Sequence, residues 1–337
     1  MAVTFKEIIS VPEINARWLK VKQYFFLRES TYDMTSRCNL RCDGCYFYEG
    51  DKQHKSDERD PLKWRALLTS EKERGITFVV LAGAEPSLVP ELCLACYEVI
   101  PLGCIASNGL RPFPREIGYK IHISVWGDDE ESKAFRGRAC LDDQLKSFKG
   151  DDRAVFVYTF TKRNIDQVDS VTRRISDEGG KITFNVFSPP MGYTGELAHD
   201  PDSFARMRRK MEEMLDRHPE AVLFSKYSAE VHADPERSLH QRFHCPYPRC
   251  NPNTKFGLGR SFRQYRTDLT WDRSVACCVP DTDCDSCRHY AAGSAIVTAR
   301  MAQHVGSEEQ FRKWLDYVDT YLAVWVRGYE KGTNLSP

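Results

Sequence analysis

Three cysteines stand close together in the chain, Cys38, Cys42 and Cys45, with the spacing C-x3-C-x2-C. Iron–sulfur clusters are held by cysteine thiolates, normally four of them. Three thiolates at this spacing can bind three irons of a 4Fe–4S cube and leave the fourth iron without a protein ligand. An iron with an open position is a coordination site for a small molecule. The pattern therefore predicts a cluster that binds a ligand.

Two other interpretations of these thiols stay open on spacing alone. Zinc sites also use cysteines, although they usually combine one C-x2-C with a second pair at a distance. Free cysteine is among the most frequently buried residue types, so the three can also be packing residues. The surroundings favour a cluster, because the motif follows a predicted strand and functional loops of barrel folds follow the carboxyl ends of strands.

The motif resembles the signature of the radical S-adenosylmethionine (SAM) enzymes. In that family the open iron binds the amino and carboxylate groups of SAM, and the reduced cluster cleaves SAM to a 5′-deoxyadenosyl radical. The cofactors carry the radical chemistry, while the protein binds, orients and excludes side reactions. The resemblance implies a 4Fe–4S cluster on Cys38, Cys42 and Cys45 as the catalytic centre, SAM as cofactor, and a flavodoxin or ferredoxin as reductant.

A second part of the resemblance follows the next predicted strand. The sequence LAGAEP at 81–86 is similar to the family's GGEP element, with Ala84 in place of the second glycine. Glycine at such a turn lets the backbone approach a ligand closely. The family's contact with the methionyl amine of SAM would fall on Gly83, Ala84 and Glu85. The alternative is an ordinary strand-to-helix turn with Pro86 near the helix start.

Polar residues at the ends of later predicted strands extend the expected SAM site. Asn108 can hydrogen-bond a ribose or a carboxylate, and Ser124 lies in a strand similar to one whose serine contacts SAM in relatives. Arg136 follows, with Arg138 as its alternative, and a planar guanidinium suits the SAM carboxylate. Asn185 would face the ribose or the substrate. Each of these, taken singly, is equally compatible with a solvated polar residue.

The residue before the third cysteine departs from the family pattern. Many relatives carry an aromatic side chain there, which lies against adenine, whereas this chain has Gly44. Aromatic residues follow the motif instead, at Tyr46, Phe47 and Tyr48. We expect adenine to meet this segment from Tyr46 onward.

The elements that must position these residues alternate between strands and helices. Short β-branched or apolar runs predict six strands: Thr31–Ser36, Ile76–Ala82, Gly103–Ser107, Lys120–Val125, Val155–Thr159 and Ile182–Phe187. Amphipathic stretches predict the helices Pro61–Arg74, Pro90–Ile100, Leu141–Phe148, Ile165–Glu178 and Ser203–Arg217. Buried strands alternating with helices imply a parallel sheet. This α/β pattern is similar to the partial (β/α)6 TIM barrel of radical SAM enzymes.

Changes in composition predict three regions along the chain. Residues 1–28 read as an N-terminal helical lead-in and 29–234 as the partial barrel. Residues 235–337 read as a Cys-rich extension that ends in two helices, Tyr290–His304 and Glu308–Tyr329. The last helix carries apolar residues at helical spacing, which is typical of core packing.

Six further cysteines fall late in the chain: Cys245, Cys250, Cys277, Cys278, Cys284 and Cys287. They resemble the auxiliary-cluster domains (SPASM and the shorter twitch type) of radical SAM enzymes, which implies a second 4Fe–4S cluster. Cys284 and Cys287 form a C-x2-C pair and are expected ligands, with Cys278 or its neighbour Cys277, and with one of Cys245 and Cys250. A zinc site is the alternative. The remaining cysteines are expected to be buried thiols: Cys93, Cys96, Cys104 and Cys140.

Bulk composition argues against several function classes. The chain has 337 residues, with Lys+Arg and Asp+Glu equal at 48 each, so no basic field favours nucleic acid. We find no apolar stretch long enough for a membrane span and no signal peptide, which predicts a cytoplasmic protein without a membrane partner. Thirteen cysteines in a chain without a secretion signal favour cluster or metal binding over disulfides.

The substrate is the least determined part of the prediction. A compact barrel with a neutral surface suits a small-molecule substrate that is polar: a sugar, a nucleoside or an intermediate of natural product biosynthesis. A peptide- or protein-modifying radical SAM enzyme is the first alternative, a non-catalytic iron–sulfur electron carrier the second and a structural zinc protein the third. Acid–base groups are expected at the mouth of the barrel: His122, Tyr158, Lys162, Arg163, Tyr193 and Glu196.

Overall fold

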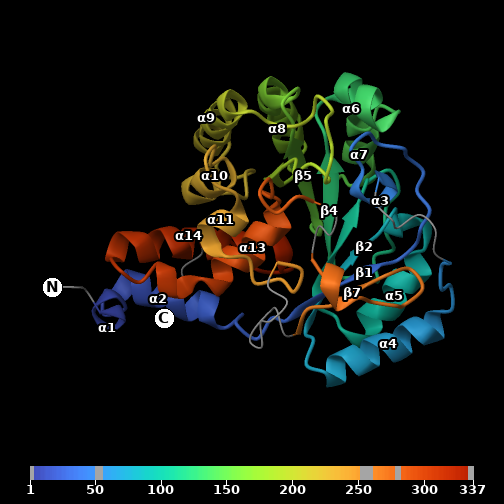
Figure 1. Cartoon of the computed structure of the whole chain (residues 1–337), viewed down its shortest axis with the longest axis horizontal. Helices are drawn as coiled ribbons and strands as arrows, with labels where there is room; N and C mark the ends of the chain where they lie inside the picture. The colour runs from blue at the N-terminus through green and yellow to red at the C-terminus, as the bar shows by residue number, and fades with distance from the viewer. Residues whose placement is uncertain (1–3, 50–55, 251–260, 278–281, 333–337) are drawn as a thin grey trace.

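A parallel seven-stranded sheet forms the centre of the protein (Figure 1). The computed structural model describes residues 4–49, 56–250, 261–277 and 282–332. The strands lie in the order β6-β5-β4-β3-β2-β1-β7, so the sheet is open and does not close into a barrel. Their bounds are β1 Glu29–Asp33, β2 Phe78–Ala82, β3 Gly103–Ser107, β4 Lys120–Val125, β5 Ala154–Phe160, β6 Ile182–Val186 and β7 Gln264–Tyr265.

The six predicted strands and the α/β partial-barrel fold are confirmed, with one addition. Strand β7 was not predicted, because two residues are too few to show an alternating pattern. It pairs in parallel with β1, where Thr31 lies opposite Gln264 and Tyr32 opposite Tyr265. Strand β1 also begins at Glu29, two residues before the predicted start, which places a carboxylate at the beginning of the strand.

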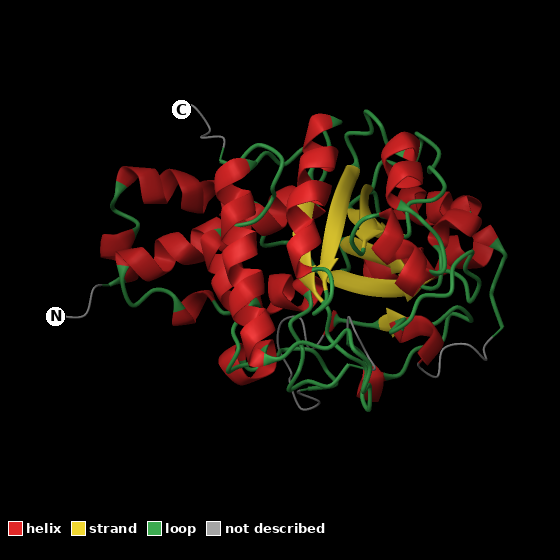
Figure 2. Ribbon diagram, turned by 90° about the horizontal axis from the view of Figure 1, so that it is seen from above, coloured by secondary structure: helices red, strands yellow, loops and turns green. Residues whose placement is uncertain are grey.

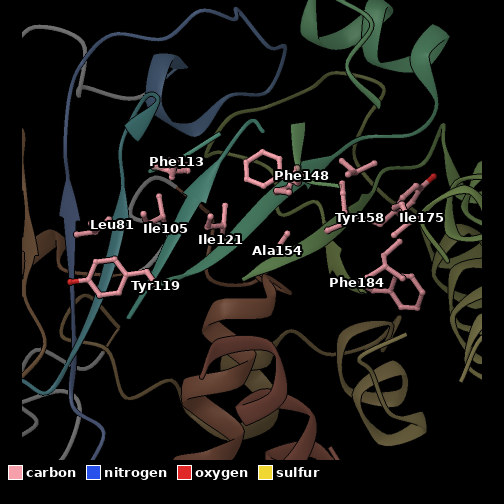
Figure 3. Packing of buried hydrophobic residues seen from close by; sticks show 14 of the residues in the cluster. Leu81, Ile105, Phe113, Tyr119, Ile121, Phe148, Ala154, Tyr158, Ile175 and Phe184 are labelled. Atoms are coloured by element: carbon pink, nitrogen blue, oxygen red, sulfur yellow. The ribbon is translucent and has the colours of Figure 1, made fainter. Parts of the chain in front are cut away.

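Helices cover the outer face of the sheet. Their bounds are α4 Pro61–Glu73, α5 Pro90–Val99, α7 Leu141–Ser147, α8 Val168–Asp177 and α9 Pro201–Arg217. One hydrophobic cluster joins these helices to alternate strand residues, among them Leu81, Ile105 and Ile121 (Figure 3). Side chains alternate between the two faces of a strand, so their neighbours point to the inner face.

The inner face packs on helices from both ends of the chain. Phe78, Cys104 and Val155 belong to a second cluster that includes α2 (Pro12–Lys22), α13 (Tyr290–Ala299) and α14 (Glu308–Trp325). The rings of Phe78 and Trp325 lie 6.4 Å apart. Figure 1 shows α2 and α14 side by side, and Figure 2 shows helices on both sides of the sheet. The terminal helices therefore cover the inner face at the ends where the strands begin.

The remaining helices are short: α1 Phe5–Ile8, α3 Tyr46–Glu49, α6 Asp129–Arg136, α10 Lys226–His232 and α11 Leu239–Phe243. The expected N-terminal helices and the two closing helices are confirmed, although α13 stops at Ala299 and a short 3-10 turn follows. The division of the chain at residues 28 and 234 stays a prediction. In the described part of the chain, no helix combines the length and the apolar character needed to cross a bilayer.

A buried carboxylate fastens β7 to the rest of the sheet. Glu71 of α4 accepts hydrogen bonds from the Arg74 Nε (2.7 Å), the Arg263 Nη1 (3.1 Å) and the Tyr265 hydroxyl (2.9 Å). The ring of Tyr265 also stacks on Tyr32 of β1, with centroids 5.3 Å apart. Glu71 is fully buried, so its negative charge must be balanced by the two arginines that bond to it.

Candidate active site and a cysteine cavity

A cavity of about 240 Å³, here called the central cavity, lies at the inner face of the sheet. The residues predicted for the first cluster and for SAM all line it: Cys38, Cys42, Cys45, Tyr46, Gly83, Ala84, Glu85, Asn108, Ser124, Arg136 and Asn185. They lie near the carboxyl ends of β1 to β6 or in the loops that follow. Parallel strands bring these ends to one edge, which is why residues so far apart in sequence meet.

The three-cysteine loop is held by hydrogen bonds to its neighbours. Met34 N–H donates to the Ala82 carbonyl (2.9 Å), and Ala84 N–H donates to the Thr35 carbonyl (3.0 Å). Asp43 N–H, inside the motif, donates to the Phe135 carbonyl at the end of α6 (2.7 Å). The loop is therefore attached both to the loop after β2 and to α6.

Gly83 is required by its backbone. Its φ is +114°, and an added Cβ would lie 2.9 Å from the Met34 nitrogen. Outside glycine, His244 and Leu269 are the described residues with positive φ, so Ala84 is not in the left-handed region. The replacement of the family's second glycine by Ala84 therefore introduces no backbone strain here.

Glu85 organises the upper end of the central cavity, where the strands end. Its carboxylate accepts hydrogen bonds from Ser87 N–H (2.9 Å), Ser107 Oγ (2.8 Å) and Asn108 N–H (2.7 Å). The Asn108 side chain in turn donates to Asn39 Oδ1 (2.7 Å) and lies 3.7 Å from Cys38 Sγ. Glu85 and Asn108 thus link β3 to the cysteine loop.

Arg136 is a buried cation beside the thiols. Its Nη1 donates to the Ser124 carbonyl (2.6 Å), while its Nε has no hydrogen-bond partner in the described part of the protein. Burial lowers the pKa of the guanidinium, but the nearby thiols of Cys42 and Cys140 raise it above its ordinary value. A buried N–H without an acceptor fits a ligand carboxylate, as expected for SAM.

Asn185 holds the floor of the cavity to the sheet. Its Oδ1 accepts a hydrogen bond from Tyr290 N–H (3.0 Å), and its Nδ2 donates to Thr159 Oγ1 (3.2 Å). Tyr290 is the first residue of α13, so this bond positions that helix under the sheet. The amide is already engaged within the protein, which makes Asn185 a positioning residue as well as a lining one.

The floor of the central cavity carries residues that were not predicted as site residues: Glu29, Tyr247, His289, Tyr290 and Trp325. The Tyr247 hydroxyl donates to Glu29 Oε1 (2.6 Å). Burial raises the pKa of Glu29 to about 7, and the Tyr247 hydrogen bond lowers it by less. The rings of Tyr290 and Trp325 stack with centroids 5.4 Å apart. The residues at 289–290 and 325 follow no local motif, so only the fold reveals their position.

Of the expected acid–base groups, His122 lines the central cavity. Its ring nitrogens lie 2.8 Å from the Tyr290 hydroxyl and 3.0 Å from the Val324 carbonyl. Burial lowers the pKa of His122 to about 4, so the ring is neutral near pH 7. The other five are not among the residues that line the cavity; for example, the Tyr158 hydroxyl donates to the Asn164 carbonyl within the outer core.

A second cavity, here called the cysteine cavity, is lined by five late thiols: Cys245, Cys250, Cys277, Cys284 and Cys287. The sulfurs of Cys250 and Cys284 lie 3.0 Å apart. The expected ligand Cys278 lies outside the described residues, and its neighbour Cys277, the alternative to it, lines the cavity. A hydrogen bond with Cys245 raises the pKa of Cys250 to about 12.

The donor set of the cysteine cavity fits a cluster. His240 Nδ1 and Thr282 Oγ1 line it, and both are buried without a hydrogen-bond partner among the described atoms. In the described ranges no three His, Cys, Asp or Glu side chains converge tightly enough to hold a single ion. Five thiols line this small cavity, and a cube on separate thiols would require the sulfurs of Cys250 and Cys284, now 3.0 Å apart, to move apart. Cys93, Cys96, Cys104 and Cys140 are buried, as expected.

No protein-family model matches the chain. Over 85 residues it is 35% identical to the S-adenosylmethionine-dependent nucleotide dehydratase of Thermoplasmatales archaeon (strain ISO4-H5), which covers 24% of this chain and 29% of that protein. Over 167 residues it is 23% identical to the sporulation killing factor maturation protein SkfB of Bacillus subtilis (strain 168), covering 45% of this chain and 40% of SkfB. The chain thus spans less than half the length of these curated relatives.

Solved structures share the fold. The crystal structure of Streptococcus suis SuiB bound to S-adenosylmethionine matches with a TM-score of 0.55 at 15% identity, over 77% of this chain and 63% of that one. SuiB bound to its precursor peptide SuiA matches with a TM-score of 0.54 at 13% identity, over 88% and 69% of the two chains. The three-cysteine loop, the open parallel sheet and the similarity to these relatives all agree with the resemblance to radical SAM enzymes.

Proposed function

We propose that the chain is an enzyme that cleaves SAM reductively and removes a hydrogen atom from a substrate held on the floor of the central cavity. The observation that carries this proposal is that the three thiols and every predicted SAM contact line one cavity. When reduced and bound to the three thiols, a 4Fe–4S cluster with an open iron would supply the one electron needed to convert SAM to methionine and a 5′-deoxyadenosyl radical.

The residues of the chain divide the work of binding between them. Arg136, with its Nε free of protein acceptors in the described structure, binds the SAM carboxylate. The backbone at 83–85 receives the methionyl amine, and Glu85 fixes that backbone through its bond to Ser87 N–H. Tyr46 lies against adenine, and Asn108 and Ser124 face the remaining polar groups of SAM. The terminal helices close the floor, so that a radical formed above it is shielded from water.

The cysteine cavity would hold an auxiliary 4Fe–4S cluster. Its five thiols exceed the four that a fully ligated cube needs, with Cys278 a further possible ligand. Ala292 and Ile296 add apolar walls, while His240, Arg249 and Thr282 add polar ones. A fully ligated cluster in such a place conducts electrons or supports the fold, with a flavodoxin or ferredoxin as the external electron source.

The charge of the central cavity limits the substrate class. Arg136 is its single cationic side chain among the described lining residues, and that guanidinium is assigned to SAM. Phosphate groups are recognised by arginine and lysine. A nucleotide, as in the name of the dehydratase relative, would therefore lack partners here. A small polar substrate without phosphate fits the cavity better.

Peptide modification is the second candidate function. It is favoured by the similarity to SkfB, a maturation protein, over 45% of this chain. The two candidates separate in one assay, because a peptide substrate is destroyed by protease and a small molecule is not. Cell extract treated with protease would lose its ability to stimulate SAM cleavage only if the substrate is a peptide.

The proposal is tested by anaerobic reconstitution with iron and sulfide, followed by dithionite and SAM. We expect 5′-deoxyadenosine to form and to be detected by mass spectrometry. Protein that holds its full iron content, binds SAM, and forms no 5′-deoxyadenosine would overturn the proposal and favour an electron carrier.

A further inference from the structure

The carboxyl group of Glu29 lies where two cavities meet. It lines the floor of the central cavity, and it also lines a further cavity of about 240 Å³ on the other side, here called the lower cavity. The lower cavity is bounded by residues of α2, α13 and α14 and by Phe78 of β2. Glu29 therefore stands at the start of β1 with space on both sides of it.

No cation of the described protein balances this carboxyl group. Glu29 forms no ion pair within the described residues, and its hydrogen bond there comes from the neutral hydroxyl of Tyr247 (2.6 Å). The described lining of the lower cavity has no other charged side chain. In the central cavity the guanidinium of Arg136 lies instead at the far end, bonded to the Ser124 carbonyl. Glu29 is half-buried, and a carboxylate there without a cation is costly, which agrees with its raised pKa of about 7.

Aromatic rings surround the same place. Tyr247, Tyr290 and Trp325 line the central cavity beside Glu29, and Tyr24 and Tyr321 line the lower cavity. The faces of such rings attract cations. The neighbouring His122 is neutral near pH 7 and does not compete for the carboxylate. A carboxyl group among aromatic walls is the chemistry that recognises a positively charged nitrogen.

We propose that Glu29 determines substrate specificity by binding a protonated amine or guanidinium group of the substrate on the floor of the central cavity. This inference rests on the proposed function, because the molecule that Glu29 binds is the substrate of the same site. The bound cation neutralises the carboxylate and offers it N–H donors. A free amine and the side chain of a lysine or arginine in a peptide share this chemistry.

The test uses the full chain with its clusters loaded and saturated with SAM, so that SAM occupies its own site. Calorimetry measures the dissociation constants of benzylamine and of benzyl alcohol, a neutral molecule of the same shape. A charge-assisted hydrogen bond predicts that benzylamine binds at least about tenfold more tightly. In Glu29→Gln we expect that preference to disappear. Glu116→Gln, at an exposed position that lines neither cavity, should keep it.

Equal affinity for the amine and the alcohol in the wild-type protein would overturn the proposal, as would an undiminished preference in Glu29→Gln. If Glu29→Gln fails to fold, the amine–alcohol comparison in the wild type still decides. Glu29→Asp, which keeps the charge and shortens the side chain, should retain part of the preference for the amine. If the carboxyl group were purely structural, neither the wild type nor any variant would prefer the amine.

A second pair of probes distinguishes a small-molecule substrate from a peptide as the source of the bound cation. Free lysine and Nα-acetyl-lysine N-methylamide present the same ammonium group on a small molecule and on a peptide-like one. Tighter binding of the capped form supports a peptide substrate, and tighter binding of the free form supports a small one. Failure of the proposed function would be seen in a different assay, in which reduced protein and SAM, with no amine added, form no 5′-deoxyadenosine.

Discussion

The central cavity and the cysteine cavity both contain several cysteine thiols, but they differ in how many thiols line them and in which segments supply those thiols. The first takes three thiols from one short loop and mixes them with Arg136, Asn108 and other hydrogen-bonding groups. The second takes five thiols from three segments, centred on 245–250, 277 and 284–287, and adds two apolar side chains, Ala292 and Ile296, and three polar ones, His240, Arg249 and Thr282. The proposed open iron at the first and the proposed fully ligated cluster at the second depend on this difference in the number of thiols.

The two cavities also differ in how far apart in the sequence their cysteines lie. The central cavity's cysteines lie within eight positions of each other after one strand, so local sequence determines their geometry. The cysteine cavity depends on contacts made over long distances in sequence, such as Arg249 N–H to the Ala276 carbonyl (3.2 Å) and Leu239 N–H to the Cys287 carbonyl (3.0 Å). Its formation therefore requires the folded C-terminal region.

The largest effect is expected from removing the first set of thiols. The variant with Cys38, Cys42 and Cys45 all changed to Ala should lose 5′-deoxyadenosine formation by at least about a thousandfold, because no cluster with an open iron remains. Its iron content should fall from about eight to about four atoms per chain, with the second cluster retained. Mass spectrometry and iron analysis measure both.

Cys96→Ala serves as the matched control for that variant. Cys96 is a buried thiol of α5 and lines neither cavity, so its loss should leave a small void that costs about 1 kcal/mol of stability. SAM cleavage at the wild-type rate per bound cluster is the expected result. If the triple variant still formed 5′-deoxyadenosine, the assignment of SAM cleavage to the central cavity would be wrong.

The next effect is expected from the second set of thiols. Cys284→Ala combined with Cys287→Ala should remove about four irons per chain while SAM cleavage without substrate falls by less than about tenfold, because the open iron belongs to the other cavity. Turnover of substrate should fall further than SAM cleavage. If the double variant keeps all of its iron, the cysteine cavity holds no cluster.

A third effect tests the Glu71 contact, which joins α4 to the segment that contains β7. Glu71→Ala leaves the guanidiniums of Arg74 and Arg263 without their buried partner, and should lower the free energy of unfolding by about 3 to 5 kcal/mol. Denaturant unfolding measures it. Glu98→Ala, which breaks an exposed pair with Arg65, is the control and should cost less than about 1 kcal/mol. Equal losses in the two variants would contradict the assigned role of Glu71.

The smallest effect concerns acid sensitivity beside the cysteine cavity. His232 bonds the Arg288 carbonyl (2.8 Å) and the Tyr317 hydroxyl (2.9 Å), and burial lowers its pKa to about 4. Below pH 6.5 the unfolded chain binds a proton there that the folded chain does not, so stability falls as pH drops toward 4. Between pH 7 and pH 5 this histidine should cost about 2 kcal/mol.

His232→Gln should remove that part of the pH dependence, as measured by urea unfolding at pH 7 and pH 5. His218→Gln, at the end of α9, is the control and should follow the wild type. An unchanged pH dependence in His232→Gln would mean that the buried imidazole does not titrate between the folded and unfolded states.

Much of the fold could be predicted because its signals are local. Six strands and the helices between them follow from alternating and helical patterns, and the cysteine motif and the LAGAEP turn follow from spacing. What could not be predicted depends on tertiary contacts. Glu29 lies just before the predicted start of its strand, and Tyr247, Tyr290 and Trp325 reach the central cavity only because the C-terminal region packs on the inner face. The adjacent Cys277 and Cys278 offer no local signal that separates them.

The pairing of β7 with β1 has a consequence for how the protein is made. Arg263 N–H bonds Ser30 Oγ across 233 positions in sequence. At a synthesis rate of roughly 5 to 20 residues per second, β1 emerges from the ribosome on the order of ten to fifty seconds before its edge partner. During that time a strand edge beside the cysteine loop offers unpaired backbone groups to other chains. The nascent chain should therefore depend on chaperones, and fragments that stop before residue 261 should aggregate.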